Sequence, residues 1–325
     1  MELPVTLSPP VKAYPAYGFP LSILYARDDR FDPWLLGQFI TVVGERGGYS
    51  LLKAEYDWMY TAEGVFKYHR YRLPPEFAQE KESLWTLLTA ILSHGQFILG
   101  VFNEKYIREK PAYRQKDQLN SYMITGFDPI RRTLSLFGST RSEPYTRYAV
   151  PYTLFLEATL HAELPDLALH IFSMNPAFIP RFDPYRCIRG IETYLSGTAE
   201  GYSQDDWACG IKALEHLHRH LPEQAGRAEG LDPELFGFLA EHKQLMERRV
   251  RALLEWRSPC GGNETVCRGY GEAVRLACQV AADVREWNKT RDRDGVSRCH
   301  KHLGDLIEME KRWLPALLKE VTPDA

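Results

Sequence analysis

The chain contains 325 residues, of which 44% are hydrophobic, 26% charged and 12% aromatic, a composition typical of a folded globular protein and unlike that of a disordered chain. The formal net charge of −3 lacks the basic excess of nucleic-acid-binding proteins, so we expect no nucleic-acid partner. Acidic Glu2 and early prolines stand where a signal peptide has a basic and then an apolar segment. The most apolar stretch, residues 87–102, is interrupted by His94, Gly95 and Gln96 and is shorter than the ~20 residues of a membrane span. We therefore expect a cytoplasmic protein that does not contact the membrane.

The first half of the chain, residues 1–180, alternates short apolar segments with helical ones. Asp32 and Pro33 suit the cap and first turn of a helix over residues 31–44. Further helices are predicted at 82–94 and 151–161, and strands at 66–73, 96–102, 121–127, 133–138 and 167–173. We expect an α+β domain with a central antiparallel sheet.

The second half, residues 181–325, changes to long amphipathic helices. Ser203 and Asp206 resemble a capping box that opens a helix to Leu221, and Asp232 begins another that reaches Trp256. Two more helices are predicted at 270–288 and 297–320. We expect this half to be an all-α helical bundle domain.

A row of charged residues follows one side of the helix that ends at Trp256. Lys243, Glu247, Arg251 and Glu255 recur at intervals of four residues, the spacing at which side chains of a helix become neighbours. The spacing predicts a ladder of ion pairs on the solvated face.

Histidines are concentrated in the segment EHLHRH, which contains His216, His218 and His220. On a helix His216 and His220 share one face, but a structural zinc site needs four converging ligands. Histidines near a helix C-terminus also suit the helix dipole as surface residues. We expect no metal and no other cofactor.

Aromatic and basic residues alternate in the segment YHRYR, residues 68–72. Tyr68 and Arg70 are therefore candidates for stacking on, and pairing with, a planar anionic ligand. The alternative is an ordinary strand that buries the stems of both side chains and exposes its other face.

The order of segments between residues 82 and 161 carries a family resemblance. A helix ending at His94 is followed by the strand QFILGVF, a tyrosine-containing connection, the strand SYMITGFD, a hairpin to TLSLFG and a helix that starts PYTLFLEA. This order resembles the core of papain-like proteins related to the N-terminal domain of butirosin biosynthesis protein H, and more distantly that of bacteriocin-processing cysteine peptidases. Gly126, Phe127 and Asp128 match the Gly-Tyr-Asp ending of their central strand. The segments CGIKALEHL and LAEHKQLMERRVRALLE are similar to the helical extension of related proteins from bacterial natural-product gene clusters.

The catalytic residues of that family are missing here. Its mechanism uses a cysteine thiolate, a histidine base and an orienting acid. All six cysteines lie after residue 186, and scattered thiols without a CxxC pair predict reduced cysteines rather than a reactive centre. Asn120 or Ser121 stands at the position of the histidine, and Gly138 or Ser139 at that of the acid. The resemblance therefore implies the fold without cysteine-peptidase activity.

Two functional hypotheses follow. In the first, the protein takes part in specialised-metabolite biosynthesis and handles acyl or peptidyl intermediates, with acyl transfer or amide formation from a carrier protein by proximity alone. Asn120, Ser121 and Gln96 would then donate hydrogen bonds to an oxyanion. The residues expected to line such a substrate cleft are Tyr68, Arg70, Tyr122 and His94. In the second, the domain is a pseudoenzyme scaffold that binds a small molecule, a peptide or a partner protein without catalysis.

Overall fold

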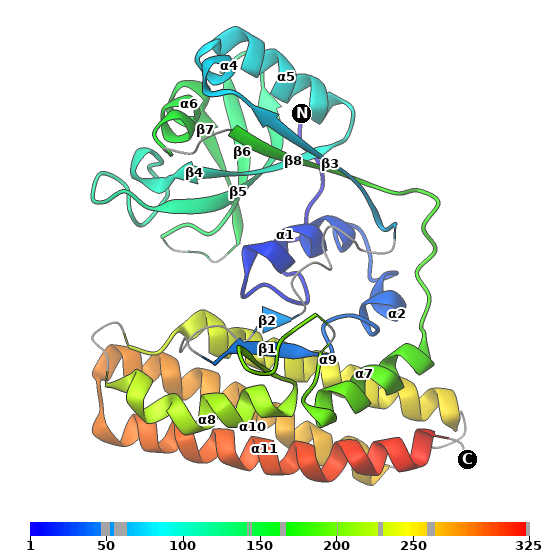
Figure 1. Cartoon of the computed structure of the whole chain (residues 1–325). Coiled ribbons are helices and arrows are strands. Elements are labelled where there is room, and N and C mark those ends of the chain that lie inside the picture. The colour runs from blue at the N-terminus through cyan, green and yellow to red at the C-terminus, as the bar shows by residue number, and fades with distance from the viewer. Residues whose placement is uncertain are drawn as a thin grey trace. The chain divides into compact units, whose positions relative to one another are not determined.

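The computed structural model of the chain describes residues 1–46, 53–54, 64–141, 143, 145–162, 167–199, 201–226, 230–258 and 264–322. It divides into two compact units, shown together in Figure 1. The first unit comprises Met1–Asp29 and Met59–Ile179, and the second Arg30–Trp58 and Pro180–Ala325. Residues 30–58 thus cluster with the second unit, which corrects the expectation of one continuous domain over residues 1–180. Within the described residues, no helix is both long and apolar enough to cross a membrane.

The first unit is built on a six-stranded sheet in which every neighbouring pair is antiparallel, which confirms the predicted α+β class. In spatial order the strands are β3 (Phe66–Leu73), β8 (Leu167–Met174), β4 (Phe97–Asn103), β5 (Leu119–Asp128), β6 (Thr133–Gly138) and β7 (Thr146–Pro151). The alternation of side chains in the sequence marked five of these strands, because successive residues of a strand point to opposite faces.

Aromatic side chains attach helices to both faces of this sheet. On one face, Trp85 of α5 (Lys81–Ser93) contacts Phe127, and Phe155 of α6 (Tyr152–Leu160) meets Tyr122 edge to face at a centroid distance of 5.3 Å. On the other face, Phe19 of α1 (Pro15–Leu24) packs on Phe137 of β6. The short helix α4 (Pro75–Gln79) and the 3-10 turn η1 (Glu104–Tyr106) also belong to this unit.

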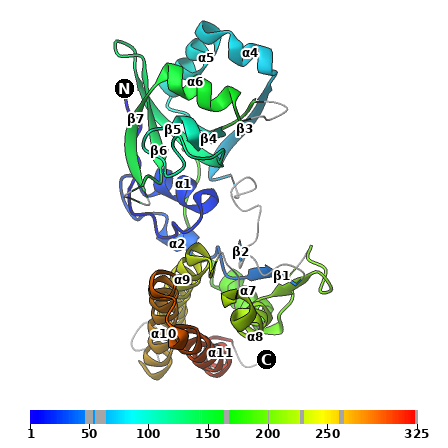
Figure 2. The same ribbon diagram turned by 90° about the vertical axis from the view of Figure 1, so that its left-hand side faces the viewer.

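The second unit is mainly helical. Among its described residues, the helices are α2 (Asp32–Leu35), α7 (Pro184–Ser196), α8 (Ile211–Ala225), α9 (Pro233–Arg257), α10 (Glu264–Thr290) and α11 (Arg293–Val321). Figure 2 views α9, α10 and α11 packed alongside one another. The predicted helix from Asp232 to Trp256 is confirmed by α9, whose Asp232 side chain caps the helix by accepting from the Glu234 N–H.

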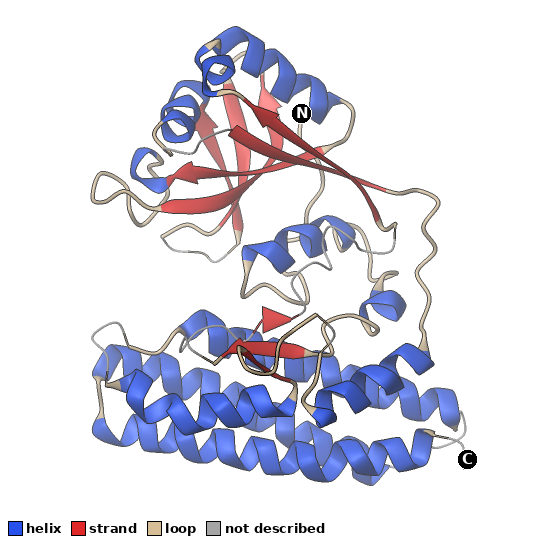
Figure 3. Ribbon diagram, viewed as in Figure 1, coloured by secondary structure: helices blue, strands red, loops and turns tan. Residues whose placement is uncertain are grey.

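This unit also contains a small three-stranded sheet that the sequence did not predict, drawn as red arrows next to the long helices in Figure 3. Its strands are β2 (Lys53–Ala54), β1 (Val42–Glu45) and β9 (Trp207–Cys209). The helix predicted from Ser203 was therefore wrong at its start. Trp207 to Cys209 pair with β1, and α8 begins only after Gly210, whose φ of 56° ends the strand.

The helix predicted over residues 31–44 was also wrong, because α2 ends at Leu35. The chain beyond it is held by buried side chains of α9. The guanidinium of Arg249 donates to the carbonyl oxygens of Leu36 and Gln38, and His242 Nε2 lies 2.9 Å from the Ile40 carbonyl oxygen. Carbonyl groups used in this way do not enter a helical hydrogen-bond ladder, so the segment runs irregularly into β1.

Candidate functional site

Asn120 is held by hydrogen bonds on both ends of its side-chain amide. Its Nδ2 donates to Glu104 Oε1 at 2.7 Å, and its Oδ1 accepts from the Ser121 backbone N–H at 2.8 Å. An oxyanion donor must be aimed at the place where charge develops in a substrate. The Asn120 amide instead donates to the Glu104 carboxylate of the same unit.

The partner of Asn120 belongs to a buried ion pair. Glu104 and Lys110 have side chains only 1% exposed, and Lys110 Nζ lies 3.6 Å from Glu104 Oε1. Lys110 Nζ also donates to the Ser139 carbonyl oxygen at 2.6 Å. Burial lowers the pKa of Lys110, and the Glu104 carboxylate acts in the opposite direction. Glu104 and Lys110 belong to the connection between β4 and β5. The hydrogen bond from Asn120 to Glu104 therefore ties this connection to the first residues of β5.

This polar cluster, composed of Glu104, Lys110, Asn120 and Ser139, occupies the place where the resemblance puts a histidine and an acid. Asn120 and the Ser139 carbonyl oxygen make no contact with each other in this cluster and are linked only through Glu104 and Lys110. Both ionisable groups are closed off from solvent. These contacts link the connection between β4 and β5 to β5 and to Ser139, which is a structural role, and the four residues of the cluster present no accessible nucleophile or base.

Ser121 and Gln96 do not join Asn120. Ser121 follows Asn120 in β5 and therefore points to the opposite face, the one that carries α1. Gln96 precedes β4 at the end where Ile98 pairs with Ile124, whereas Asn120 pairs with Phe102 at the other end. Six residues of strand, about 20 Å, separate the two ends. The three predicted oxyanion donors thus do not converge.

Tyr122 and His94 have structural roles. The Tyr122 ring is fully buried and stacks on Phe102 at a centroid distance of 5.0 Å, and burial strongly raises the pKa of its hydroxyl. His94 caps the C-terminus of α5, where its Nδ1 lies 2.8 Å from the Ala90 carbonyl oxygen. Both side chains are thus engaged in contacts within the first unit.

Tyr68 and Arg70 lie together on β3, on the same face of the sheet as Ser121. Tyr68 Oη is 2.8 Å from Nδ1 of His170, which stands opposite Arg70 in the register of β3 and β8. Burial lowers the pKa of His170, and the Arg70 charge lowers it further. Three strand spacings, about 14 Å, separate Arg70 from β5. His170 was not predicted as a site residue, since its only signal was a polar residue in the apolar strand LALHIFS.

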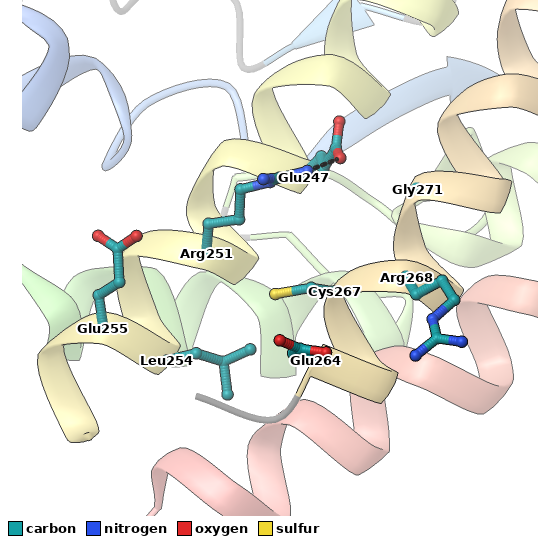
Figure 4. Close-up of a pocket in the computed structure, with 8 residues that line it drawn as sticks. All are labelled: Glu247, Arg251, Leu254, Glu255, Glu264, Cys267, Arg268 and Gly271. Carbon is teal, nitrogen blue, oxygen red and sulfur yellow. Dashed lines mark hydrogen bonds and ion pairs between the residues drawn. The ribbon is translucent and has the colours of Figure 1, made fainter. Parts of the chain in front are cut away.

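A separate cavity of about 580 Å³ lies between α9 and α10 (Figure 4). It is lined by Glu247, Arg251, Leu254, Glu255, Glu264, Cys267, Arg268 and Gly271. Arg251 donates to Glu247 at 2.7 Å, and Arg268 is directed away from Cys267 in Figure 4. Burial raises the pKa of Cys267, so its thiol stays protonated and unreactive near neutral pH. Ligand pockets of this size are usually lined by apolar side chains, whereas this one is lined mainly by charges of both signs.

The charged ladder predicted on α9 is only partly correct. Glu247 and Arg251 form the expected ion pair at the cavity, but Lys243 is fully buried against α11. As for metals, no group of three or more histidine, cysteine or acidic side chains converges in the described parts of the chain. His216 and His220 approach each other at a centroid distance of 4.5 Å, and His218 contacts His300 across α8 and α11.

No family model matches the sequence, and no curated protein matches it.

Proposed function

We propose that the chain is a non-catalytic binding protein with a papain-like first unit, and that it serves specialised-metabolite biosynthesis by holding an acyl or peptidyl intermediate, or the carrier that bears it. The resemblance of residues 82–161 to natural-product proteins supports the pathway. The geometry around Asn120 supports the absence of catalysis.

The single observation that carries this proposal is the hydrogen bond from Asn120 Nδ2 to the buried Glu104 carboxylate. A papain-like mechanism needs a thiolate and a base within reach of substrate. No thiol precedes Cys187. Asn120, at the position of the base, is hydrogen-bonded to Glu104, which forms a buried ion pair with Lys110. Acyl transfer by proximity would also need converging donors, whereas the side chains of Asn120 and Ser121 point to opposite faces of the sheet and Gln96 lies at the other end of the strand pair.

The proposal is tested with an acyl carrier protein that carries its acyl group as a thioester. The carrier is mixed with the purified chain and a panel of primary amines, and intact-protein mass spectrometry follows every species. We expect the chain to bind the loaded carrier in a calorimetric titration while the lifetime of the thioester is unchanged and the chain gains no mass.

Asn120→Ala and Ser121→Ala provide the matched variants. Both are expected to leave carrier binding and thioester lifetime as in the native chain. An amide product that forms only in the presence of the chain, and that is lost in Asn120→Ala, would show that the protein is an acyltransferase.

A further inference from the structure

Strand β3 is one outer edge of the six-stranded sheet. It pairs with β8 over its whole length, from Phe66 opposite Met174 to Leu73 opposite Leu167. On its other side no strand is paired with it within the part of the chain that the structure describes. Alternate backbone N–H and C=O groups of an edge strand point outward, where they can accept a further strand.

The two edges of this sheet differ in form. The opposite edge, β7, ends at Pro151, and the Arg147 guanidinium on it donates to the carbonyl oxygens of Leu3 and Val5 in the N-terminal segment. Proteins often protect edge strands with proline, bulges or short length. β3 has eight residues, contains neither proline nor glycine, and keeps one continuous register with β8.

The side chains of β3 carry charge of one sign only. Lys67, His69, Arg70 and Arg72 are exposed, and the strand contains no acidic residue. Lys67 and Arg70 form no ion pair with any described residue. Tyr71, at 51% exposure, adds an aromatic surface of the kind that stabilises cross-strand pairs.

This charge selects between possible occupants of the edge. If a second copy of the chain paired through its own β3, basic side chains would stand beside basic side chains, an arrangement that destabilises a sheet. An acidic strand in the same place would put opposite charges across from each other. Charges of a single sign therefore disfavour self-association while they attract an acidic segment.

We propose that β3 is a docking edge that takes an extended, acidic peptide segment of a partner as an additional strand of the sheet. Backbone hydrogen bonds to the outer side of β3 supply the pairing, and Lys67, Arg70 and Tyr71 supply the preference for acidic and β-forming sequence. The inference rests on the proposed function, because it names the partner class of a binding protein.

The probe is a fluorescein-labelled peptide of the same eight-residue length as β3 that alternates glutamate with threonine and valine. Fluorescence anisotropy measures its affinity for the full chain. The double variant Lys67→Glu/Arg70→Glu should weaken binding by about tenfold or more, since two attractive cross-strand pairs become repulsive. The control Arg189→Glu/Lys301→Glu makes the same change in net charge at two exposed helical positions and should leave the affinity unchanged.

A second peptide separates strand pairing from charge attraction. It has the same sequence with every backbone nitrogen methylated, which removes its N–H donors and keeps its charge. We expect this peptide to bind about tenfold more weakly or not at all, because its strand-pairing bonds are lost. Amide hydrogen exchange of the native chain provides a readout without mutation, with protection gained in residues 66–73 when the unmethylated peptide is bound.

Three results would overturn the docking edge: no binding of the acidic peptide to the native chain, equal binding of the methylated peptide, or protection that maps away from β3. Each is distinguishable from failure of the proposed function. If the chain binds a loaded carrier without acyl transfer but does not bind the acidic peptide, only the docking role of β3 is rejected. Acyl transfer would reject the binding-protein proposal, whatever the peptide result.

Discussion

Lys243 of α9 and Glu310 of α11 form an ion pair in which Nζ lies 2.9 Å from the carboxylate and neither side chain is exposed. The hydroxyl groups of Tyr194 and Tyr270 donate to the same carboxylate at 2.6 and 2.7 Å. Four helices of the second unit, α7, α9, α10 and α11, therefore meet at one buried carboxylate. Burial lowers the pKa of Lys243, and the negative charge of Glu310 opposes that shift.

Removing the Glu310 carboxylate should strongly destabilise the protein. In Glu310→Ala the Lys243 ammonium stays buried without its counter-charge, so we expect the free energy of unfolding to fall by about 3–5 kcal/mol. Urea denaturation followed by circular dichroism measures the change. The control is Glu308→Ala, which removes an exposed partner of Lys311 and should cost at most about 1 kcal/mol. Equal losses in the two variants would mean that burial does not govern the contribution of the pair.

Replacing both Lys243 and Glu310 with apolar residues should destabilise the protein less than removing Glu310 alone. Lys243→Met combined with Glu310→Leu removes the ion pair and fills its space with apolar atoms. Because desolvation of two ions offsets much of their attraction, we expect the double variant to recover about 1–4 kcal/mol relative to Glu310→Ala. Thermal unfolding of the three proteins at one pH provides the comparison. A double variant less stable than Glu310→Ala would contradict the argument and point to the tyrosine hydroxyls, which lose their acceptor.

Asn120 should contribute to stability rather than to activity. Asn120→Ala removes the hydrogen bond to the buried Glu104 carboxylate, so we expect the free energy of unfolding to drop by about 1–3 kcal/mol. The neighbouring Ser121→Ala should change it by about 0.5 kcal/mol or less. Chemical denaturation of both variants measures the difference. An Asn120→Ala protein as stable as the native chain would show that the Glu104–Lys110 pair holds the end of β5 without it.

His242 predicts how stability depends on pH. Burial lowers its pKa well below the ordinary value, and the charges of Lys243 and Arg249 act in the same direction. The unfolded chain takes up this proton near pH 6.5, whereas the native chain does so only at lower pH. The native state thus binds fewer protons, and stability must fall as the pH decreases through about 6.5.

The measurement is urea denaturation at a series of pH values between about 5 and 7.5. His242→Gln keeps an N–H donor for the Ile40 carbonyl oxygen and removes the titration. Its stability should depend less steeply on pH, by up to about 1.4 kcal/mol per pH unit. A slope equal to that of the native chain would indicate that His242 does not contribute.

Local sequence patterns were sufficient to locate most elements of the first unit and the long helix α9. The strands at 66–73 and 133–138 were confirmed to the residue by β3 and β6, because period-two alternation is a property of the strand itself. The hairpin between β5 and β6 followed from the same pattern and its Asp-Pro turn. The predicted site was not assembled, because the side chains of Asn120 and Ser121 point to opposite faces of the sheet and Gln96 lies at the other end of the β4–β5 pair.

Which distant residues contact each other was decided by the tertiary structure alone. Spacing of four residues placed Lys243 on a helix face, but only a contact with Glu310, 67 residues further along the chain, made that face buried. The same holds for residues 36–40, which a helix-like pattern could not assign to the second unit, because Arg249 binds their carbonyl groups across more than 200 residues. Periodicity along a chain reports the local backbone, whereas burial and pairing depend on which distant surfaces meet, and that information is absent from any single window of sequence.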